Sequence, residues 1–182
     1  MAKQTVIGLV GLPGAGKSTA LSIIKKIAPV VIMGDIVRAE VIKSGAEINS
    51  KTLGDMSKII RQLKGNTFLA EKCVDKIKTM KDGLIFIDGI RSMQEVKYFR
   101  KYWDLPIIAI ICSDEIRHKR LLERGRKDDS LDIEKILGRD KREIGFGVDK
   151  VIIEAEFKIE NDRDVHHLKK ELMKIIRNFL TT

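Results

Sequence analysis

The sequence predicts an α/β protein in which helices cover both faces of a parallel sheet of five strands. Short apolar runs alternate with helical patterns from one end of the chain to the other, and a glycine-rich turn follows the first apolar run directly. Strands that are apolar throughout are typical of parallel sheets buried on both faces. With 182 residues, of which 43% are hydrophobic and 34% charged, the chain is long enough for one such domain with a full core.

The elements are expected where the period of the apolar pattern changes. Buried strands are predicted at 5–10, 30–33, 84–87, 106–112 and 157–159. Helices are predicted at 17–27, 35–43, 94–102, 114–124, 130–144 and 165–179, with Asp35 as the N-cap of the second one. Residues 49–80 carry two amphipathic helical patterns and no strand. We therefore expect a single domain over 1–182, with a helical insertion at about 35–80 and a basic insertion at about 124–145.

The composition narrows the classes of partner and compartment. A net charge of +9 suits an anionic ligand, whereas an aromatic content of 5% offers few side chains for stacking on bases, so nucleic acid is not the expected partner. No apolar run approaches the ~20 residues that span a bilayer. The first strand begins almost at once, so we expect no signal peptide and no membrane partner, and we predict a cytoplasmic location. The sequence carries no indication of the oligomeric state.

The cysteines and histidines carry no sign of a catalytic thiol or a metal site. Cys73 and Cys112 are expected to be reduced and buried, as small hydrophobic residues of an intracellular protein. His118, His166 and His167 lie in charged helical patterns without Cys or Asp partners at ligand spacing, so we expect them on the surface and expect no zinc site.

The strongest signal is a phosphate-binding loop of the Walker A type, G-x-x-x-x-G-K-[ST]. The strand at 5–10 precedes it and a helical pattern follows it, which is the context that the motif requires. Backbone amides of such a loop surround a phosphate, its lysine reaches the β- and γ-phosphates, and its serine ligates Mg²⁺. The predicted ATP-binding residues are Gly11, Leu12, Pro13, Gly14, Ala15, Gly16, Lys17, Ser18 and Thr19.

A carboxylate and an arginine follow the third predicted strand in the stretch FIDGIRS. Asp88 comes directly after four apolar residues and is expected at the carboxyl edge of the sheet, where ligands of open α/β folds bind. We predict that Ser18 ligates Mg²⁺ directly and that Asp88 does so through water. Arg91 follows three residues later, and Arg38 lies in the stretch MGDIVR after the second strand. Two arginines at the ends of separate strands favour a second anion, because their planar groups bind a phosphate with two hydrogen bonds each.

Further arginines gather after the fourth strand. Arg120 and Arg124 lie in the stretch RLLERGR, and Arg139 and Arg142 lie in the next helical pattern, in GRDKRE. Phosphoryl transfer is catalysed mainly by positioning and charge neutralisation, and one well-placed arginine contributes roughly 10³–10⁵ in rate. A lid that carries arginines also excludes water from the reacting phosphate.

Taken together, GLPGAGKS, MGDIVR, IDGIRS, RLLERGR and RDKRE resemble a mainly archaeal P-loop family related to adenylate kinases, which is similar to nucleoside monophosphate kinases and dephospho-CoA kinases. The resemblance implies a P-loop core of five parallel strands, an acceptor-binding helical arm and a lid. It implies that Arg38 and Arg91 hold the acceptor phosphate and that the arginines at 120, 124, 139 and 142 clasp the transferring phosphate. Met33 replaces the usual threonine of adenylate kinases, and Arg91 follows Asp88 one residue earlier than the arginine of their D-G-F-P-R motif.

These features predict an enzyme that uses ATP and Mg²⁺ to phosphorylate a small phosphate-bearing acceptor such as a nucleotide. Lys17 and the lid arginines are the expected catalytic residues, and Asp35, Arg38, Asp88 and Arg91 the expected acceptor-binding residues. Asp35 or Asp88 is expected to accept a proton where the acceptor is a hydroxyl. Two other classes fit the same motifs: a switch that binds ATP and AMP with slow hydrolysis, and an RNA-linked NTPase. A dephospho-CoA kinase is a further alternative within the kinase class.

Overall fold

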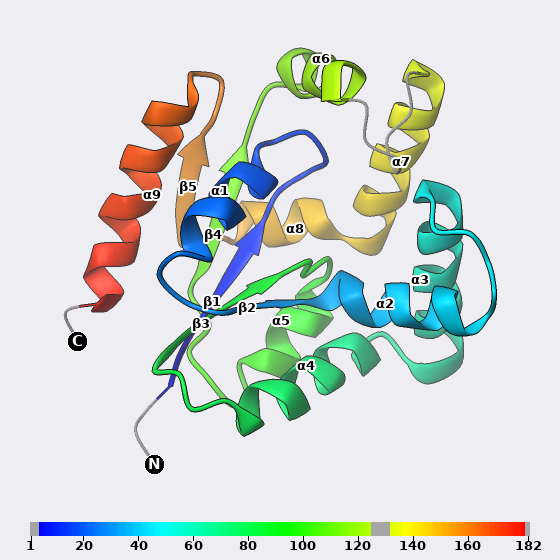
Figure 1. Cartoon of the computed structure of the whole chain (residues 1–182), viewed down its shortest axis with the longest axis horizontal. Coiled ribbons are helices and arrows are strands. Elements are labelled where there is room, and N and C mark those ends of the chain that lie inside the picture. Colours follow the sequence, from blue (N-terminus) through cyan, green and yellow to red (C-terminus); the bar gives the residue numbers. More distant parts are fainter. Residues whose placement is uncertain (1–3, 125–131, 181–182) are drawn as a thin grey trace.

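The computed structural model describes residues 4–124 and 132–180, with the backbone alone at Arg124 (Figure 1). The described part contains one sheet of five strands in the order β2-β3-β1-β4-β5. Each pair of neighbouring strands is parallel, and the register aligns Leu9 of β1 with Asp88 of β3. The strands are β1 (Thr5–Val10), β2 (Val30–Ile32), β3 (Leu84–Asp88), β4 (Ile107–Ile111) and β5 (Phe157–Glu160).

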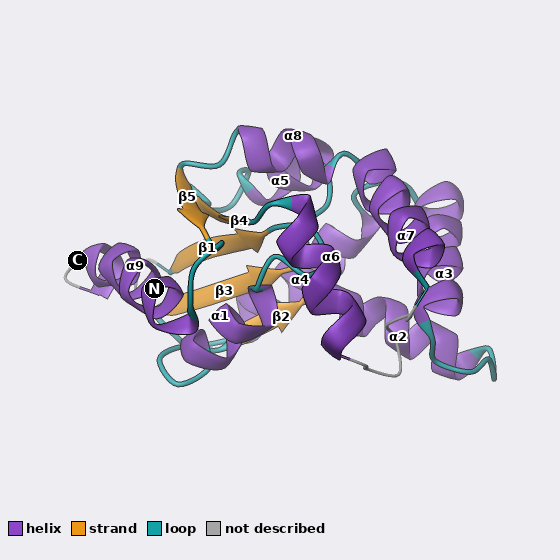
Figure 2. Ribbon diagram, turned by 90° about the horizontal axis from the view of Figure 1, so that it is seen from above, coloured by secondary structure: helices purple, strands orange, loops and turns teal. Residues whose placement is uncertain are grey.

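The helices connect these strands and extend beyond the sheet. In Figure 2 the sheet lies between helices on its two faces, and α7 and α3 stand together at one end of the molecule. The helices of the described part are α1 (Lys17–Ile24), α2 (Met33–Lys43), α3 (Ser50–Lys64), α4 (Phe68–Thr79), α5 (Met93–Phe99), α6 (Asp114–Arg124), α7 (Ile133–Phe146), α8 (Val148–Ile153) and α9 (Val165–Leu180).

Two apolar cores, one on each face, explain why the strands are apolar throughout. Successive side chains of a strand point to opposite faces, so Val6 belongs to one core and Ile7 to the other. Val6 packs in the core formed with α2, α3, α4, α5 and α8, whereas Ile7 packs in the core formed with α1 and α9. This arrangement confirms the predicted α/β class with a parallel sheet covered on both faces.

One local expectation about the elements was wrong, and one short helix was not expected. Asp35 is not an N-cap: α2 begins at Met33 with Ile32 as its N-cap, so Asp35 lies in the first helical turn. Met33 is fully buried, and its packing starts the helix directly at the end of the short strand β2. An acidic residue in a first turn still interacts favourably with the helix dipole. Helix α8 was not predicted, because six residues are too short to show a helical period.

Two expectations about burial were also wrong. Cys73 is buried as predicted, but Cys112 is only partly buried, because β4 ends one residue before it. His118 is not a surface residue: its side chain is 16% exposed and its Nε2 lies 2.8 Å from Asp140 Oδ2 of α7. This partner is 22 residues away, so no local spacing indicated it. No helix within residues 4–124 and 132–180 is long and apolar enough to cross a membrane.

Candidate functional site

The phosphate loop lies between β1 and α1 and is held from outside by two other segments. Gly14 has φ +81° and packs against the backbone of Arg117 in α6, so a side chain there would collide with that backbone. Gly16 has φ +108°, and a Cβ on it would overlap the Asn161 amide. That amide donates a hydrogen bond of 2.7 Å to the Ala15 carbonyl. The loop conformation is therefore fixed by α6 and by the segment after β5.

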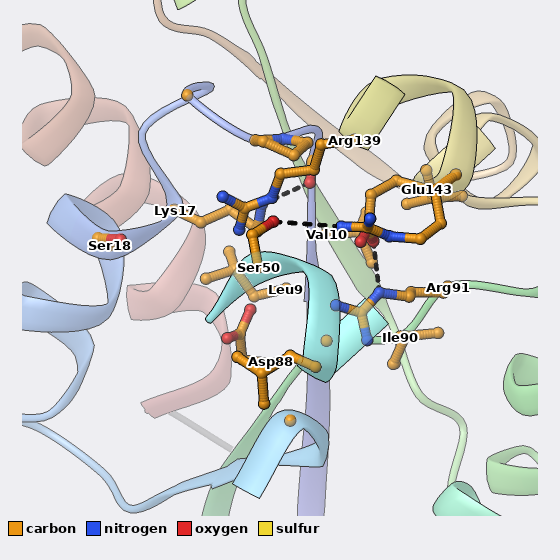
Figure 3. Close-up of a pocket in the computed structure, with 18 of the residues that line it drawn as sticks. Leu9, Val10, Lys17, Ser18, Ser50, Asp88, Ile90, Arg91, Arg139 and Glu143 are labelled. Carbon is orange, nitrogen blue, oxygen red and sulfur yellow. Dashed lines mark hydrogen bonds and ion pairs between the residues drawn. The ribbon is translucent and has the colours of Figure 1, made fainter. Parts of the chain in front are cut away.

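Lys17 folds back over the loop. Its Nζ donates to the carbonyl oxygens of Gly11 and Leu12, the second at 3.1 Å. Burial lowers the pKa of the Lys17 ammonium below its usual range, against the opposing effect of Asp88. An ammonium with few water contacts, held by neutral carbonyls, gains free energy when an anionic phosphate replaces them. Lys17, Ser18 and Asp88 lie in the same cleft in Figure 3.

Asp88 ends β3 beside Leu9 of β1, next to the start of the loop. Its Oδ1 is buried and has no hydrogen-bond partner within the described residues. Burial raises the pKa of the Asp88 carboxyl, which Lys17 and Arg91 partly counteract. A buried carboxylate oxygen without a partner fits a ligand that arrives with its own hydrogen-bond donors, such as a water on Mg²⁺. The residues present therefore fit the predicted magnesium position, with Ser18 in the first turn of α1 on the same cleft.

Arg38 lines the cleft from α2 and forms an ion pair with Asp35, one turn before it. The two atoms Nη1 and Oδ1 are 2.8 Å apart, and both side chains are about half exposed. Asp35 is not among the residues that line the cleft. Exposed pairs at this spacing contribute little free energy, so Arg38 is readily released toward another anion.

The backbone of Arg91 is held in place by a buried glutamate. Its backbone N–H donates to Glu95 Oε2 at 2.7 Å, and Glu95 is itself fully buried and paired with Arg61 at 2.7 Å. The Arg91 side chain forms an ion pair with Glu143 of α7. The charge of Glu143 is the main cause that raises the pKa of Arg91 above its usual value, against the effect of burial.

The arginines after the fourth strand come to the cleft from two helices. Arg139 and Arg142 line it from α7, and Arg142 Nη2 lies 3.5 Å from Ser50 Oγ at the start of α3. Arg120 lines it from α6, and its described hydrogen bonds go to Cys112 Sγ at 3.4 Å and the Arg163 carbonyl at 3.3 Å, near the ends of β4 and β5. The side chain of Arg124 and residues 125–131 of the predicted lid lie outside the described residues.

A buried ionic cluster joins α6, α7 and the phosphate loop. Arg117 Nη2 lies 2.6 Å from Asp140 Oδ2, and both side chains are less than one tenth exposed. Arg117 also donates to the Pro13 carbonyl at 3.3 Å, and His118 bonds the same Asp140 oxygen. This cluster positions α7, and with it Arg139 and Arg142, relative to the loop. Sequence reasoning missed it because its members are far apart in the chain.

One cleft of about 530 Å³ thus brings together the loop, the ends of β1 and β3, and helices α2, α3, α6 and α7. Its described lining contains more cations than carboxylates, as expected for a site that binds several phosphate charges. The carboxylates are Asp88, Glu123 and Glu143, and the cations are Lys17, Arg38, Arg91, Arg120, Arg139 and Arg142.

Comparison of the sequence with known proteins identifies the family of this chain. The profile of a family described as an AAA domain matches residues 10–137. A UPF0200 protein from Methanocaldococcus jannaschii is 40% identical over 178 residues, covering 96% of this chain and 90% of that protein. The chain belongs to the UPF0200 family. Another UPF0200 protein, from Methanococcus vannielii, is 38% identical over 95% of this chain and 97% of its own length. The sequence resemblance to an archaeal P-loop family is thereby confirmed.

Solved structures confirm the P-loop kinase-like fold of this UPF0200 protein. The crystal structure of TT1252 from Thermus thermophilus matches with a TM-score of 0.66 and 17% identity, covering 97% of this chain and 98% of that one. A shikimate kinase from Acinetobacter baumannii, solved in complex with shikimate, matches with a TM-score of 0.60 and 16% identity over 99% of this chain and 95% of that one. At these identities the likeness concerns the fold.

Proposed function

We propose that this protein is an ATP- and Mg²⁺-dependent phosphotransferase of the nucleoside monophosphate kinase type. It would transfer the γ-phosphoryl group of ATP to a small acceptor that carries a phosphate. The observation that carries the proposal is the single cleft in which the phosphate loop faces arginines from α2, α6, α7 and the end of β3. The loop is the part of the cleft that binding of one nucleotide requires. The arginines on the side of the cleft opposite the loop are suited to a second anion.

On the donor side, the amides of the loop and Lys17 bind the β- and γ-phosphates of ATP. Lys17 exchanges the carbonyls of Gly11 and Leu12 for phosphate oxygens, so its charge becomes paired only in the complex. Ser18 and, through water, Asp88 would hold Mg²⁺, which neutralises charge on the phosphates when it is bound. Arg120 lies on this side of the cleft, near the ends of β4 and β5.

On the acceptor side, Arg38 and Arg91 bind the acceptor phosphate, and Arg139 and Arg142 neutralise charge on the group in transfer. The bond between the γ-phosphorus and the bridging oxygen of ATP breaks, a bond to an acceptor oxygen forms, and ADP leaves with the electron pair. An acceptor phosphate oxygen attacks without a base. A hydroxyl acceptor must lose a proton, and the partly buried Asp88 carboxylate in the cleft is better placed to take it than Asp35.

The experiment is a transfer assay with γ-³²P-ATP and a panel of acceptors that includes nucleoside monophosphates and dephospho-CoA. We expect the label to move to at least one acceptor, in a reaction that needs Mg²⁺. Label that appears only as inorganic phosphate, whichever acceptor is offered, would refute the proposal.

The alternatives give different results in the same assay. A switch would bind ATP and AMP without transfer. A dephospho-CoA kinase would label dephospho-CoA alone within the panel. An RNA-linked NTPase would respond to RNA, with an affinity that falls steeply with salt.

One relative suggests a protein partner. A protein from Archaeoglobus fulgidus described as UPF0200/UPF0201 is 36% identical over 97% of this chain, but the match covers only 57% of that protein. We propose that the chain works beside a separate UPF0201 protein, since two units joined in one chain are held at high effective concentration. Co-purification of the two proteins at micromolar concentration tests this, and two independent peaks in size-exclusion chromatography would contradict it.

A further inference from the structure

Glu143 occupies an unusual place in the cleft. It is one of three carboxylates in the described lining, and its side chain is only 13% exposed. It lies on α7 opposite Arg91, and its Oε2 accepts a hydrogen bond from Arg91 Nε (Figure 3). An acidic side chain at the centre of a site for anions opposes ligand binding unless it has a role of its own.

Glu143 is surrounded by the same cations that would bind phosphate groups in the proposed reaction. Burial acts to raise the pKa of Glu143, but Arg91, Arg139 and Lys17 outweigh it and hold the pKa below its usual range. Arg142 is adjacent in sequence and interacts with the same carboxylate. A carboxylate with two oxygens among these cations resembles part of a phosphate group in charge and in hydrogen-bonding geometry.

We propose that Glu143 is an internal competitor for the phosphate that binds at Arg91. Arg91 has a fixed backbone, because its N–H is bonded to the buried Glu95. Glu143 occupies the Nε edge of the guanidinium, so a phosphate that binds this edge has to displace the carboxylate. The inference rests on the proposed function in one respect, namely that a phosphate enters the cleft beside Arg91.

Two consequences distinguish this role from other roles. The competitor keeps Arg91 engaged when ATP alone is bound, so the arginine becomes available only when the acceptor phosphate displaces the carboxylate. It also selects for acceptors with enough charge to displace it. If Glu143 were a general base, its loss would remove turnover without changing anion affinity, and a purely structural ion pair would affect stability alone.

The test measures anion binding without ATP or turnover, so its failure is distinct from failure of the transfer assay. Inorganic phosphate and pyrophosphate are titrated calorimetrically into the wild type and the Glu143→Gln variant, which keeps the size of the side chain and removes its charge. We expect binding that is on the order of tenfold tighter or more, since like charges a few ångströms apart in a partly buried site repel by at least that factor. Glu123→Gln is the matched control, because it removes a carboxylate from the same cleft that has no described partner, and we expect a change of less than about twofold.

Unchanged or weaker binding in Glu143→Gln would overturn the inference. So would equal tightening in the two variants, which would indicate a general effect of net charge. A second measurement needs no variant: in the wild type, the NMR signal of the Arg91 Nε–H should shift as phosphate is titrated. A signal that stays in place at saturation would mean that Arg91 keeps its carboxylate partner, and the proposal would fail.

Discussion

The ion pair between Glu95 and Arg61 offers a direct test of how the cleft is supported. Glu95 Oε1 lies 2.7 Å from Arg61 Nη2, and its Oε2 accepts the Arg91 N–H at 2.7 Å. Glu156 is a matched control, because one of its oxygens pairs with an arginine and the other accepts the Ile107 N–H at 2.8 Å. The two glutamates differ in burial: the Glu95 side chain is 0% exposed and that of Glu156 is 42% exposed.

We expect Glu95→Gln to reduce the free energy of unfolding by about 3 kcal/mol. Removing one partner of a buried ion pair costs roughly 3–5 kcal/mol, because the other charge stays buried without compensation. The lower end applies because the Arg61 guanidinium keeps the Ser57 carbonyl at 3.1 Å and lies 4.7 Å from the centre of the Phe146 ring. Glu156→Gln should cost less than about 1 kcal/mol, as exposed pairs do.

Urea unfolding followed by circular dichroism measures both variants against the wild type, with the slope checked for constancy. A third variant, Arg61→Met with Glu95→Gln, removes both charges and should recover most of the loss. The reasoning is refuted if the two single variants cost the same within about 0.5 kcal/mol, or if the double variant is less stable than Glu95→Gln. Either result would mean that the uncompensated charge is not what destabilises the protein.

Three other predictions can be tested, two of them on the cleft and one on the cysteines. Gly54→Ala places a Cβ 2.6 Å from Arg142 Cζ, so the guanidinium has to move. We expect calorimetry to show weaker phosphate binding, while the urea midpoint stays equal to or above that of the wild type. Unchanged binding would show that phosphate binding does not need the guanidinium at this place. Lys17→Ala should abolish ATP turnover while the circular dichroism spectrum is retained, and retained turnover would mean that the loop is not used. Burial raises the pKa of Cys112 to about 11 and that of Cys73 to about 12, so both remain thiols at pH 8. Both should therefore react slowly with an alkylating reagent, Cys112 before Cys73. Mass spectrometry that finds Cys73 modified first would contradict this order.

The sheet and the phosphate loop were predictable because their signals are local. Each strand is a short apolar run, and the strand predicted at Thr5–Val10 has the same bounds in the structure. Gly11 and Gly16 of the loop were predictable because the Walker A motif specifies glycine at these two positions. The helix predicted at 130–144 begins instead at Ile133, since Asp132 accepts the Glu134 N–H and caps it. Such shifts of a few residues arise because the local geometry of the cap, and not the period of the apolar pattern, determines where a helix begins.

The partners of the charged side chains were not predictable. Arg91 was expected to face a ligand, but nothing in the stretch FIDGIRS indicates that Glu143, 52 residues later, pairs with it. The cluster of Arg117 and Asp140 is likewise assembled by packing between α6 and α7. These contacts depend on the three-dimensional path of the chain, whereas a sequence pattern reports only the neighbours within a strand or a helix.

The contact between Asn161 and the phosphate loop has a consequence for how the protein is made. The Asn161 amide and the Ala15 carbonyl that it bonds are 146 residues apart. On the ribosome the loop is synthesised well before Asn161, which follows β5 and holds the loop from below through this hydrogen bond. A nascent chain therefore carries the whole motif without a rigid loop until β5 has been added. Nucleotide binding at full strength is expected to begin only after Asn161 has been synthesised, which keeps chains that stop before it from competing for ATP.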